Sequence, residues 1–185
     1  MPRKHKLRKL SMTINEYAEA ILPIIKLCLK EKANNPTSYK SSHLWYIYRQ
    51  AFYGFTEFID WKSRCRVSVD AMAEYKKIDP FGDLRNRKWY EQKDFDSGIQ
   101  KGKFHLEHIF TGDMFRDAIE SLSAELLTVD RLVDIVRDHY SVAWILKTEN
   151  KRLPRSDRGK SLQEALKIYE QKGIKLLEVL HPTGA

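Results

Sequence analysis

The chain has 185 residues, of which 42% are hydrophobic and 31% are charged. This length and composition predict one soluble globular domain and argue against a disordered protein, because the apolar residues suffice to bury a core. The best apolar run, residues 21–29, is interrupted by Pro23 and Lys26 and is far shorter than the roughly 20 residues of a membrane-spanning helix, so no membrane partner is expected. The basic start leads to Glu16 and Glu19 before any apolar core, which indicates no signal peptide and a cytoplasmic protein.

The charge and the cysteines narrow the choice of partner and metal. The formal net charge is +8, which favours a polyanionic partner, and nucleic acid is the leading candidate. The two cysteines, Cys28 and Cys65, have no second Cys or His at ligand spacing. We therefore expect neither a disulfide nor a zinc site.

The N-terminal third predicts a basic arm and two helices. Residues 1–12 form the arm, and residues 13–185 are expected to form the domain. Thr13 and Glu16 make a capping box for a helix that reaches about Ala33, which Pro23 should kink or break. After a turn at residues 34–37, residues 42–61 predict a second helix. Its many aromatics lie at helical spacing, which favours core packing over a stacking platform for unpaired bases.

The middle of the chain is less regular. Residues 69–77 predict a short helix, and residues 78–102 carry the loop signals Asp-Pro-Phe-Gly-Asp and Asp-Phe-Asp-Ser-Gly. The loop is basic, which makes it a candidate for substrate contact. Its cations include Arg85, Arg87, Lys88 and Lys93.

The remaining elements predict an α+β fold that is mainly α. Strands are expected at residues 103–109 and 142–146, with two helices between them, from Thr111 or Asp113 to about Leu127 and from Thr128 onward. Thr148 should cap a short helix that ends before Pro154, and Ser161 should cap one that ends at Gly173. Residues 174–180 fit a last strand or a helix turn.

Three side chains in the second half suggest phosphodiester chemistry. Glu107 and His108 end the first predicted strand, and Asn150 lies in the short helix after the second. Hydrolysis needs a base, a divalent ion and cations that hold the backbone. His108 suits the base, while Glu107 and Asn150 offer hard oxygen ligands for one Mg²⁺ or Mn²⁺. We expect the two segments to meet in space.

This arrangement resembles the ββα-metal element of the HNH endonucleases. The pair Glu107-His108 resembles that family's acid-histidine pair, and Asn150 stands where the helical Asn or second His falls. Residues 144–153, Trp-Ile-Leu-Lys-Thr-Glu-Asn-Lys-Arg-Leu, followed by a helix around Tyr169, are similar to phage and prokaryotic proteins of this type. The resemblance spans about residues 104–173 and implies a nuclease element at residues 103–155.

The chain departs from the family pattern in its spacing. His108 and Asn150 are 42 positions apart, and the usual Gly-Gly loop and middle Asn are missing. Neighbours in a regular strand point to opposite faces, so the strand must end or bulge at His108 for Glu107 to share its ion. His105, two residues before Glu107, falls on the same face as Glu107 and is a possible additional ligand or orienting group.

The predicted function is a Mg²⁺-dependent endonuclease that acts on DNA more readily than on RNA. Two alternatives stay open: a basic helical module that binds DNA or RNA without cleaving it, and a helical partner-binding protein. Six cations around the second segment are predicted to contact phosphates: Lys147, Lys151, Arg152, Arg155, Arg158 and Lys160.

Overall fold

The computed structural model describes residues 12–41, 44–96, 102–154 and 158–180. The predicted basic arm, apart from Met12, lies outside these residues, as does Arg155. Within the described ranges, no helix is both long enough and apolar enough to cross a membrane.

The described residues are mainly helical and contain a four-stranded mixed sheet, which confirms the predicted α+β class. The α-helices are α1 Ile14–Asn34, α2 Pro36–Ser41, α3 Leu44–Thr56, α4 Val69–Lys76, α5 Gln92–Phe95, α6 Gly112–Glu120, α7 Val129–His139, α8 Lys147–Asn150 and α9 Leu162–Gln171. The strands are β1 Cys65–Ser68, β2 Phe104–His108, β3 Val142–Leu146 and β4 Leu176–Leu177. Short 3-10 turns are η1 Trp61–Arg64, η2 Leu84–Asn86 and η3 Trp89–Glu91.

The strands lie in the order β2-β3-β1-β4, so that β2 and β4 are the edges. Strand β1 is parallel to β3, whereas β2 is antiparallel to β3 and β4 is antiparallel to β1. The predicted pair of strands is therefore half of a larger sheet.

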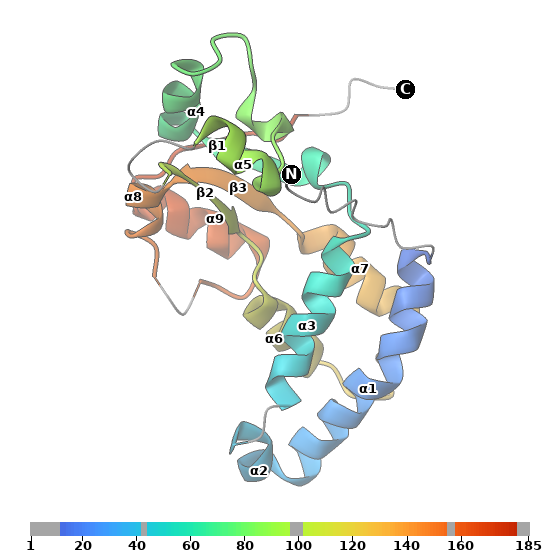
Figure 1. Ribbon diagram of the computed structural model, residues 1–185. Coiled ribbons are helices and arrows are strands. Elements are labelled where there is room, and N and C mark those ends of the chain that lie inside the picture. The colour runs from blue at the N-terminus through green and yellow to red at the C-terminus, as the bar shows by residue number, and fades with distance from the viewer. Residues whose placement is uncertain (1–11, 42–43, 97–101, 155–157, 181–185) are drawn as a thin grey trace.

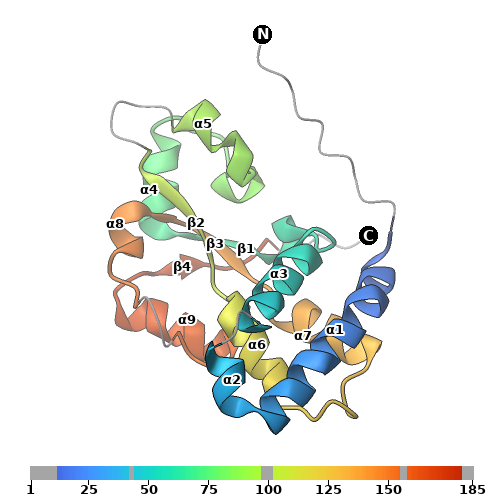
Figure 2. The same cartoon turned by 60° about the horizontal axis from the view of Figure 1, so that its bottom comes forward.

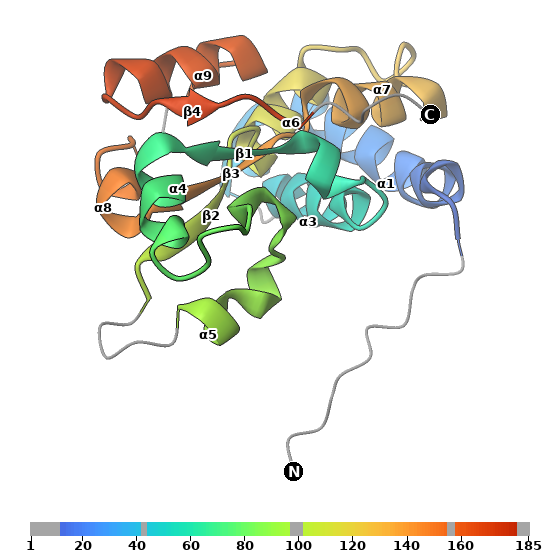
Figure 3. The same ribbon diagram turned by 90° about the horizontal axis from the view of Figure 1, so that it is seen from above.

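Helices cover both faces of the sheet, and further helices lie at one end of it. Figure 3 shows α9 on one face and α4 and α5 on the other. A helical half, made of α1, α2, α3, α6 and α7, lies at the end of the sheet where β2 finishes (Figures 1 and 2). The two halves meet where α3 and α6 approach the strand ends.

An aromatic core joins the helical half together. The Phe52 ring of α3 lies 5.6 Å from the Phe115 ring of α6 and 5.9 Å from the Phe110 ring. Phe55, one turn further along α3, contacts Tyr17 of α1 with centroids 4.9 Å apart. These side chains bury large apolar areas, which is the main stabilising term for such a cluster.

Only one side of α3 is core. Tyr48, Phe52 and Phe55 are buried as the helical spacing predicts. Trp45, Tyr46 and Tyr53 are instead exposed. The helix ends at Thr56, five residues before the predicted end at Trp61.

Capping residues fix most helix starts as predicted. Thr13 and Glu16 form the capping box of α1, Thr111 caps α6, Thr128 caps α7 and Ser161 caps α9. Of the two predicted effects of Pro23, a kink or a break, the break does not occur, because α1 runs through this residue. Helix α8 begins at Lys147, so Thr148 lies inside it and is not its cap.

Strand β1 was not predicted. Its four residues, Cys-Arg-Val-Ser, carry Arg66 between two buried apolar side chains, and they follow a basic stretch. In the structure β1 occupies the centre of the sheet and pairs with both β3 and β4. The last predicted element, residues 174–180, contains the short strand β4.

Candidate functional site

The two segments predicted to meet lie side by side. Phe104 pairs with Leu146 and His108 pairs with Val142 along the β2-β3 ladder. Helix α8 follows β3 directly, and the Lys147 N–H donates to the Lys103 carbonyl at 2.8 Å. Figure 1 shows α8 at the end of the strand pair where β2 begins.

Glu107 and His108 point to opposite faces of the sheet. The strand ends at His108, and beyond it the Ile109 and Phe110 N–H groups both donate to the Ser141 carbonyl, at 2.9 and 3.4 Å. Successive side chains of a regular strand alternate between faces. Glu107 contacts His105 and Arg158, whereas the His108 ring contacts aromatic side chains, so the structure does not bring the two together at one ion as predicted.

His108 also lies far from α8. Its partner Val142 is four residues from Leu146, which separates it from the start of α8 by about 13 Å at the usual rise of a strand. Asn150, at the end of α8, and His108 therefore stand at opposite ends of the strand pair and do not form the predicted site.

The His108 ring sits among aromatic side chains. Its centroid is 5.7 Å from the Tyr53 ring, 6.1 Å from Phe52 and 6.2 Å from Tyr140. Burial in these surroundings lowers the pKa of His108 below its ordinary value of 6.5. The ring is thus a neutral member of the interface between the sheet and the helical half.

Glu107 joins two other charged or polar side chains on the α9 face, which we call the Glu107 cluster: His105, Glu107 and Arg158. The His105 Nε2 and Glu107 Oε2 atoms are 2.7 Å apart. Arg158 Nη1 donates to the other carboxylate oxygen, Oε1. The predicted placement of His105 on the same face as Glu107 is confirmed.

The Glu107 cluster is only partly open to solvent. The side chain of Glu107 is 14% exposed and that of Arg158 is 17% exposed, whereas His105 is 37% exposed. Burial raises the pKa of Glu107, but the hydrogen bond from His105 and the charge of Arg158 outweigh it, so the pKa is below its usual value. Glu107 is therefore an ionised carboxylate at neutral pH.

Arg158 reaches the sheet from the segment between α8 and α9. Its Nε donates to the Pro154 carbonyl at 2.9 Å, which holds the guanidinium over Glu107. The prediction that Arg158 contacts phosphate is not supported by this position, because the side chain is used internally. Instead, Arg158 ties the cationic segment to the strand that carries His105 and Glu107.

A second carboxylate, Glu149, is buried in α8. Its Oε2 accepts from the Ser68 hydroxyl at 2.6 Å and from the Leu146 N–H at 2.7 Å. It therefore joins the ends of the parallel strands β1 and β3 to the first turn of α8. Sequence reasoning assigned Glu149 no role, although its place three residues after Leu146, near a helix start, is the signal of a capping glutamate.

Two buried oxygens in this region have no hydrogen-bond partner among the described residues: Asn150 Oδ1 and Tyr169 Oη. Burial, followed by the charge of Glu107, raises the pKa of Tyr169, so this phenol from α9 lies within electrostatic range of the Glu107 cluster. Buried polar atoms without partners are uncommon in folded proteins.

The donor set does not fit the predicted metal centre. Both oxygens of Glu107 are engaged by His105 and Arg158, and His108 is on the other face. In the part of the chain that the structure describes, no three His, Cys, Asp or Glu side chains converge to hold an ion. Asn150 Oδ1 is a free hard oxygen, but one such ligand does not make a site.

The other predicted phosphate contacts differ in exposure. Lys151, Arg152 and Lys160 are exposed, and Lys147 is half-buried. Arg152 Nη2 lies 3.7 Å from Glu149 Oε1. Three exposed cations thus flank the segment that Arg158 anchors to the sheet.

Comparison of the chain with protein-family models, curated proteins and solved structures finds no match.

Proposed function

We propose that the protein hydrolyses phosphodiester bonds of nucleic acid, with His105 as the general base and Glu107 as its positioning residue. The observation that carries this proposal is the 2.7 Å contact between His105 Nε2 and Glu107 Oε2. An ionised carboxylate only accepts hydrogen bonds, so it holds the hydrogen on Nε2 and leaves the Nδ1 lone pair for a water molecule.

The chemistry needs no group beyond water and the phosphodiester for its balance. Nδ1 of His105 takes a proton from water, the water oxygen forms a bond to phosphorus, and the ester P–O bond breaks. The leaving alkoxide takes a proton from solvent, and the imidazolium returns its proton to water. The exposed side chains of Lys151, Arg152 and Lys160 supply positive charge for the phosphate backbone.

Dependence on Mg²⁺ or Mn²⁺ stays a prediction from the HNH resemblance, and no step above passes through an ion. A cytoplasmic location belongs to the same proposal. It agrees with two buried free cysteines, which a reducing compartment preserves. DNA is the expected substrate, with RNA as the comparison.

A cleavage assay tests the proposal. End-labelled DNA and RNA of one sequence are incubated with the protein in Mg²⁺, Mn²⁺ or EDTA, and products are separated by size. His105→Ala should slow cleavage by about 100- to 10,000-fold, the usual contribution of a general base. The control His139→Ala removes an imidazole that stacks on Phe110, away from the Glu107 cluster, and should cleave normally.

A second candidate function is binding of nucleic acid without cleavage. It is favoured by the exposed cations Lys151, Arg152 and Lys160, and the pairing of Glu107 with Arg158 fits a structural role for Glu107. Gel retardation without products in any metal condition would support this second candidate and refute hydrolysis. Equal cleavage by wild type and His105→Ala would refute the assigned base.

A further inference from the structure

The loop between α4 and α5 exposes an unusual set of large apolar side chains. Phe81 is 99% exposed, Trp89 67%, Ile78 51% and Tyr90 46%. Single exposed apolar residues are common, whereas several in one segment mark a candidate interaction site, and here four lie within 13 positions. We call Ile78, Phe81, Trp89 and Tyr90, with the hollow beside Phe81, the loop surface.

The backbone that carries the loop surface is held in place by internal bonds. Arg87 Nε donates to the Tyr75 hydroxyl at 2.6 Å, and the Arg87 carbonyl accepts from Trp144 Nε1 at 3.0 Å. The Gly82 N–H donates to Asp79 Oδ1 at 2.9 Å. The exposed rings are therefore presented by an ordered scaffold, which lowers the entropic cost of binding.

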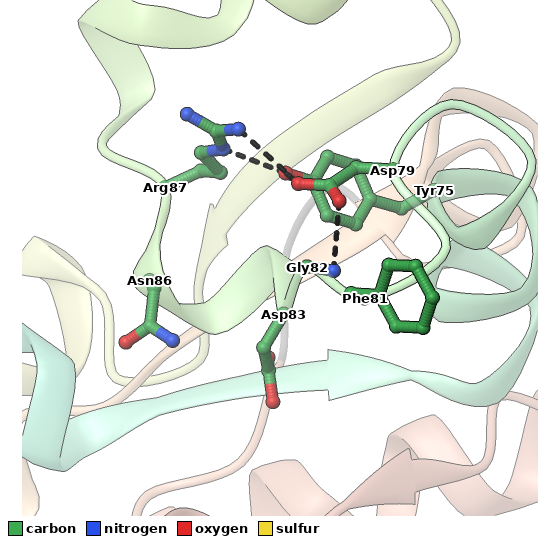
Figure 4. A pocket seen from close by; sticks show the side chains of 7 residues that line it. All are labelled: Tyr75, Asp79, Phe81, Gly82, Asp83, Asn86 and Arg87. Carbon is green, nitrogen blue, oxygen red and sulfur yellow. Dashed lines mark hydrogen bonds and ion pairs between the residues drawn. The ribbon is translucent and has the colours of Figure 1, made fainter.

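A hollow of about 320 Å³ opens beside Phe81. Figure 4 shows Phe81 at one side of it, the Asp79 and Arg87 pair at another, and the Asn86 amide at its rim. Tyr75, Gly82 and Asp83 complete the lining. A flat aromatic ring next to amide, carboxylate and guanidinium groups suits a planar heterocycle that carries hydrogen-bond donors and acceptors.

The charge around the loop surface is positive. Six Lys or Arg and three Asp or Glu lie between residues 76 and 93. Asp83 is paired with Arg85, Asp79 with Arg87 and Lys77 with Glu74, which leaves Lys76, Lys88 and Lys93 against the single anion Glu91. Lys88 Nζ lies 5.5 Å over the Tyr90 ring, so one cation stands directly beside an aromatic face.

We propose that the loop surface binds unpaired bases of single-stranded nucleic acid, with Phe81 and Trp89 as stacking residues and the lysines on the phosphates. Exposed aromatic rings interleaved with cations are how single strands are bound without sequence readout, and each stacked base contributes about 1–3 kcal/mol. Bases of a duplex are already stacked on one another and present no free faces. The inference deepens the proposed function and rests on it for the choice of nucleic acid as ligand.

The test measures fluorescence anisotropy of labelled oligothymidylate and of a labelled duplex with the full chain. The wild type should bind the single strand more tightly than the duplex. Phe81→Ala and Trp89→Ala should each weaken single-strand binding by about 5- to 140-fold, which is one stacked base converted to affinity. Leu126→Ala is the matched control, because Leu126 is 67% exposed outside the loop surface, and it should bind normally.

Quenching of tryptophan fluorescence gives a second readout. Oligothymidylate should quench the wild-type emission, and Trp89→Phe should lose most of this quenching while retaining affinity through its ring. Because Phe81 and Trp89 are so exposed, these variants should fold as the wild type does, which circular dichroism checks. Unchanged affinity in both alanine variants, or a preference for the duplex, would overturn the inference.

The outcomes separate this inference from the proposed function. If the wild type binds the single strand but never cleaves it, the proposed hydrolysis is refuted. The inference that the loop surface binds single strands still stands. If Phe81→Ala and Trp89→Ala both cleave with unchanged KM and kcat, the loop surface is not the binding site for single strands. The proposed hydrolysis is then unaffected. If neither nucleic acid binds, the loop surface is not a nucleic-acid site, and a protein partner becomes the alternative for its apolar residues.

Discussion

Two histidines of one strand have different chemical surroundings because they lie three residues apart. His105 faces Glu107 and remains partly open to water, whereas His108 is enclosed by Phe52, Tyr53 and Tyr140. Glu107 and His108 are adjacent in the sequence, but their side chains lie on opposite faces of the sheet. The pair that shares a face is His105 and Glu107, as the two-residue period of a strand requires.

The pKa of His108 predicts a pH dependence of stability. Because the folded pKa lies below 6.5, the unfolded chain binds more protons between the folded pKa and 6.5. The contribution of neutral His108 is complete above pH 6.5 and is lost as the pH falls from there toward the folded pKa. His108→Phe should keep the aromatic packing and remove this loss, as urea unfolding at a series of pH values will show. Identical pH profiles for the two proteins would contradict the assigned burial.

Glu107 and Arg158 should be coupled in stability. Removing one partner leaves the other partly buried and unpaired, so Glu107→Gln and Arg158→Met should each lower the free energy of unfolding by about 2–4 kcal/mol. The double variant should lose less than the sum of the two, by about 1–3 kcal/mol in a double-mutant cycle. Additive losses would mean that the two side chains do not interact.

Acid should weaken the ion pair between Glu107 and Arg158, because it protonates the carboxylate. The pKa of Glu107 is below its ordinary value of 4.5, so its stabilising contribution is present above pH 4.5 and is lost as the pH falls through the folded pKa. This window begins at pH 4.5, whereas that of His108 begins at pH 6.5. A loss of stability that starts between these two pH values therefore belongs to His108.

At the scale of elements, the helices and strands that the sequence predicts are those marked by capping residues or by an apolar pattern. The caps Thr13, Thr111, Thr128 and Ser161 mark helix starts that the structure confirms, because a side-chain hydrogen bond to a free N–H acts within three residues. The strands β2 and β3 were also found from their apolar patterns. Strand β1 was missed since a four-residue strand with one Arg has too short a pattern to stand out from a basic stretch.

Glu149 is the residue on which the junction of β1, β3 and α8 depends. Its substitution by Ala leaves the Ser68 hydroxyl and the Leu146 N–H without their acceptor in a buried place, and should cost about 2–4 kcal/mol of unfolding free energy. Glu164 holds the same capping position in α9 but is exposed, so Glu164→Ala should cost no more than about 1 kcal/mol. Equal losses in thermal or urea unfolding would contradict the structural role of Glu149.

At the scale of the whole molecule, long-range contacts decide the candidate site, and the sequence does not encode them locally. The meeting of residues 104–108 with residues 142–146 was predicted correctly across two helices. The partner of Glu107 was not, because Arg158 lies 51 positions away, and neither periodicity nor capping links the two. Predicted as a phosphate contact, this arginine turned out to be internal.

The net charge of +8 predicts a strong salt dependence of nucleic-acid binding. For single strands, the slope of log K against log salt should fall in magnitude by about 0.7 for each phosphate contact removed. Lys151→Gln combined with Lys160→Gln should therefore lower the slope by about 1.4. Lys30→Gln, on the exposed side of α1, is the control and should leave the slope unchanged. An unaltered slope in the double variant would mean that Lys151 and Lys160 do not contact phosphates.

The central claim is that the proposed hydrolysis takes place at the Glu107 cluster, on the α9 face of the sheet. It does not take place at His108, where the sheet meets the helical half. Single-turnover cleavage of one labelled oligonucleotide by His105→Ala and His108→Phe, with protein in excess over substrate, tests this claim most directly. The structure predicts a loss of about 100-fold or more for His105→Ala and a rate within a few-fold of wild type for His108→Phe. Normal cleavage by His105→Ala together with inactive, folded His108→Phe would contradict it.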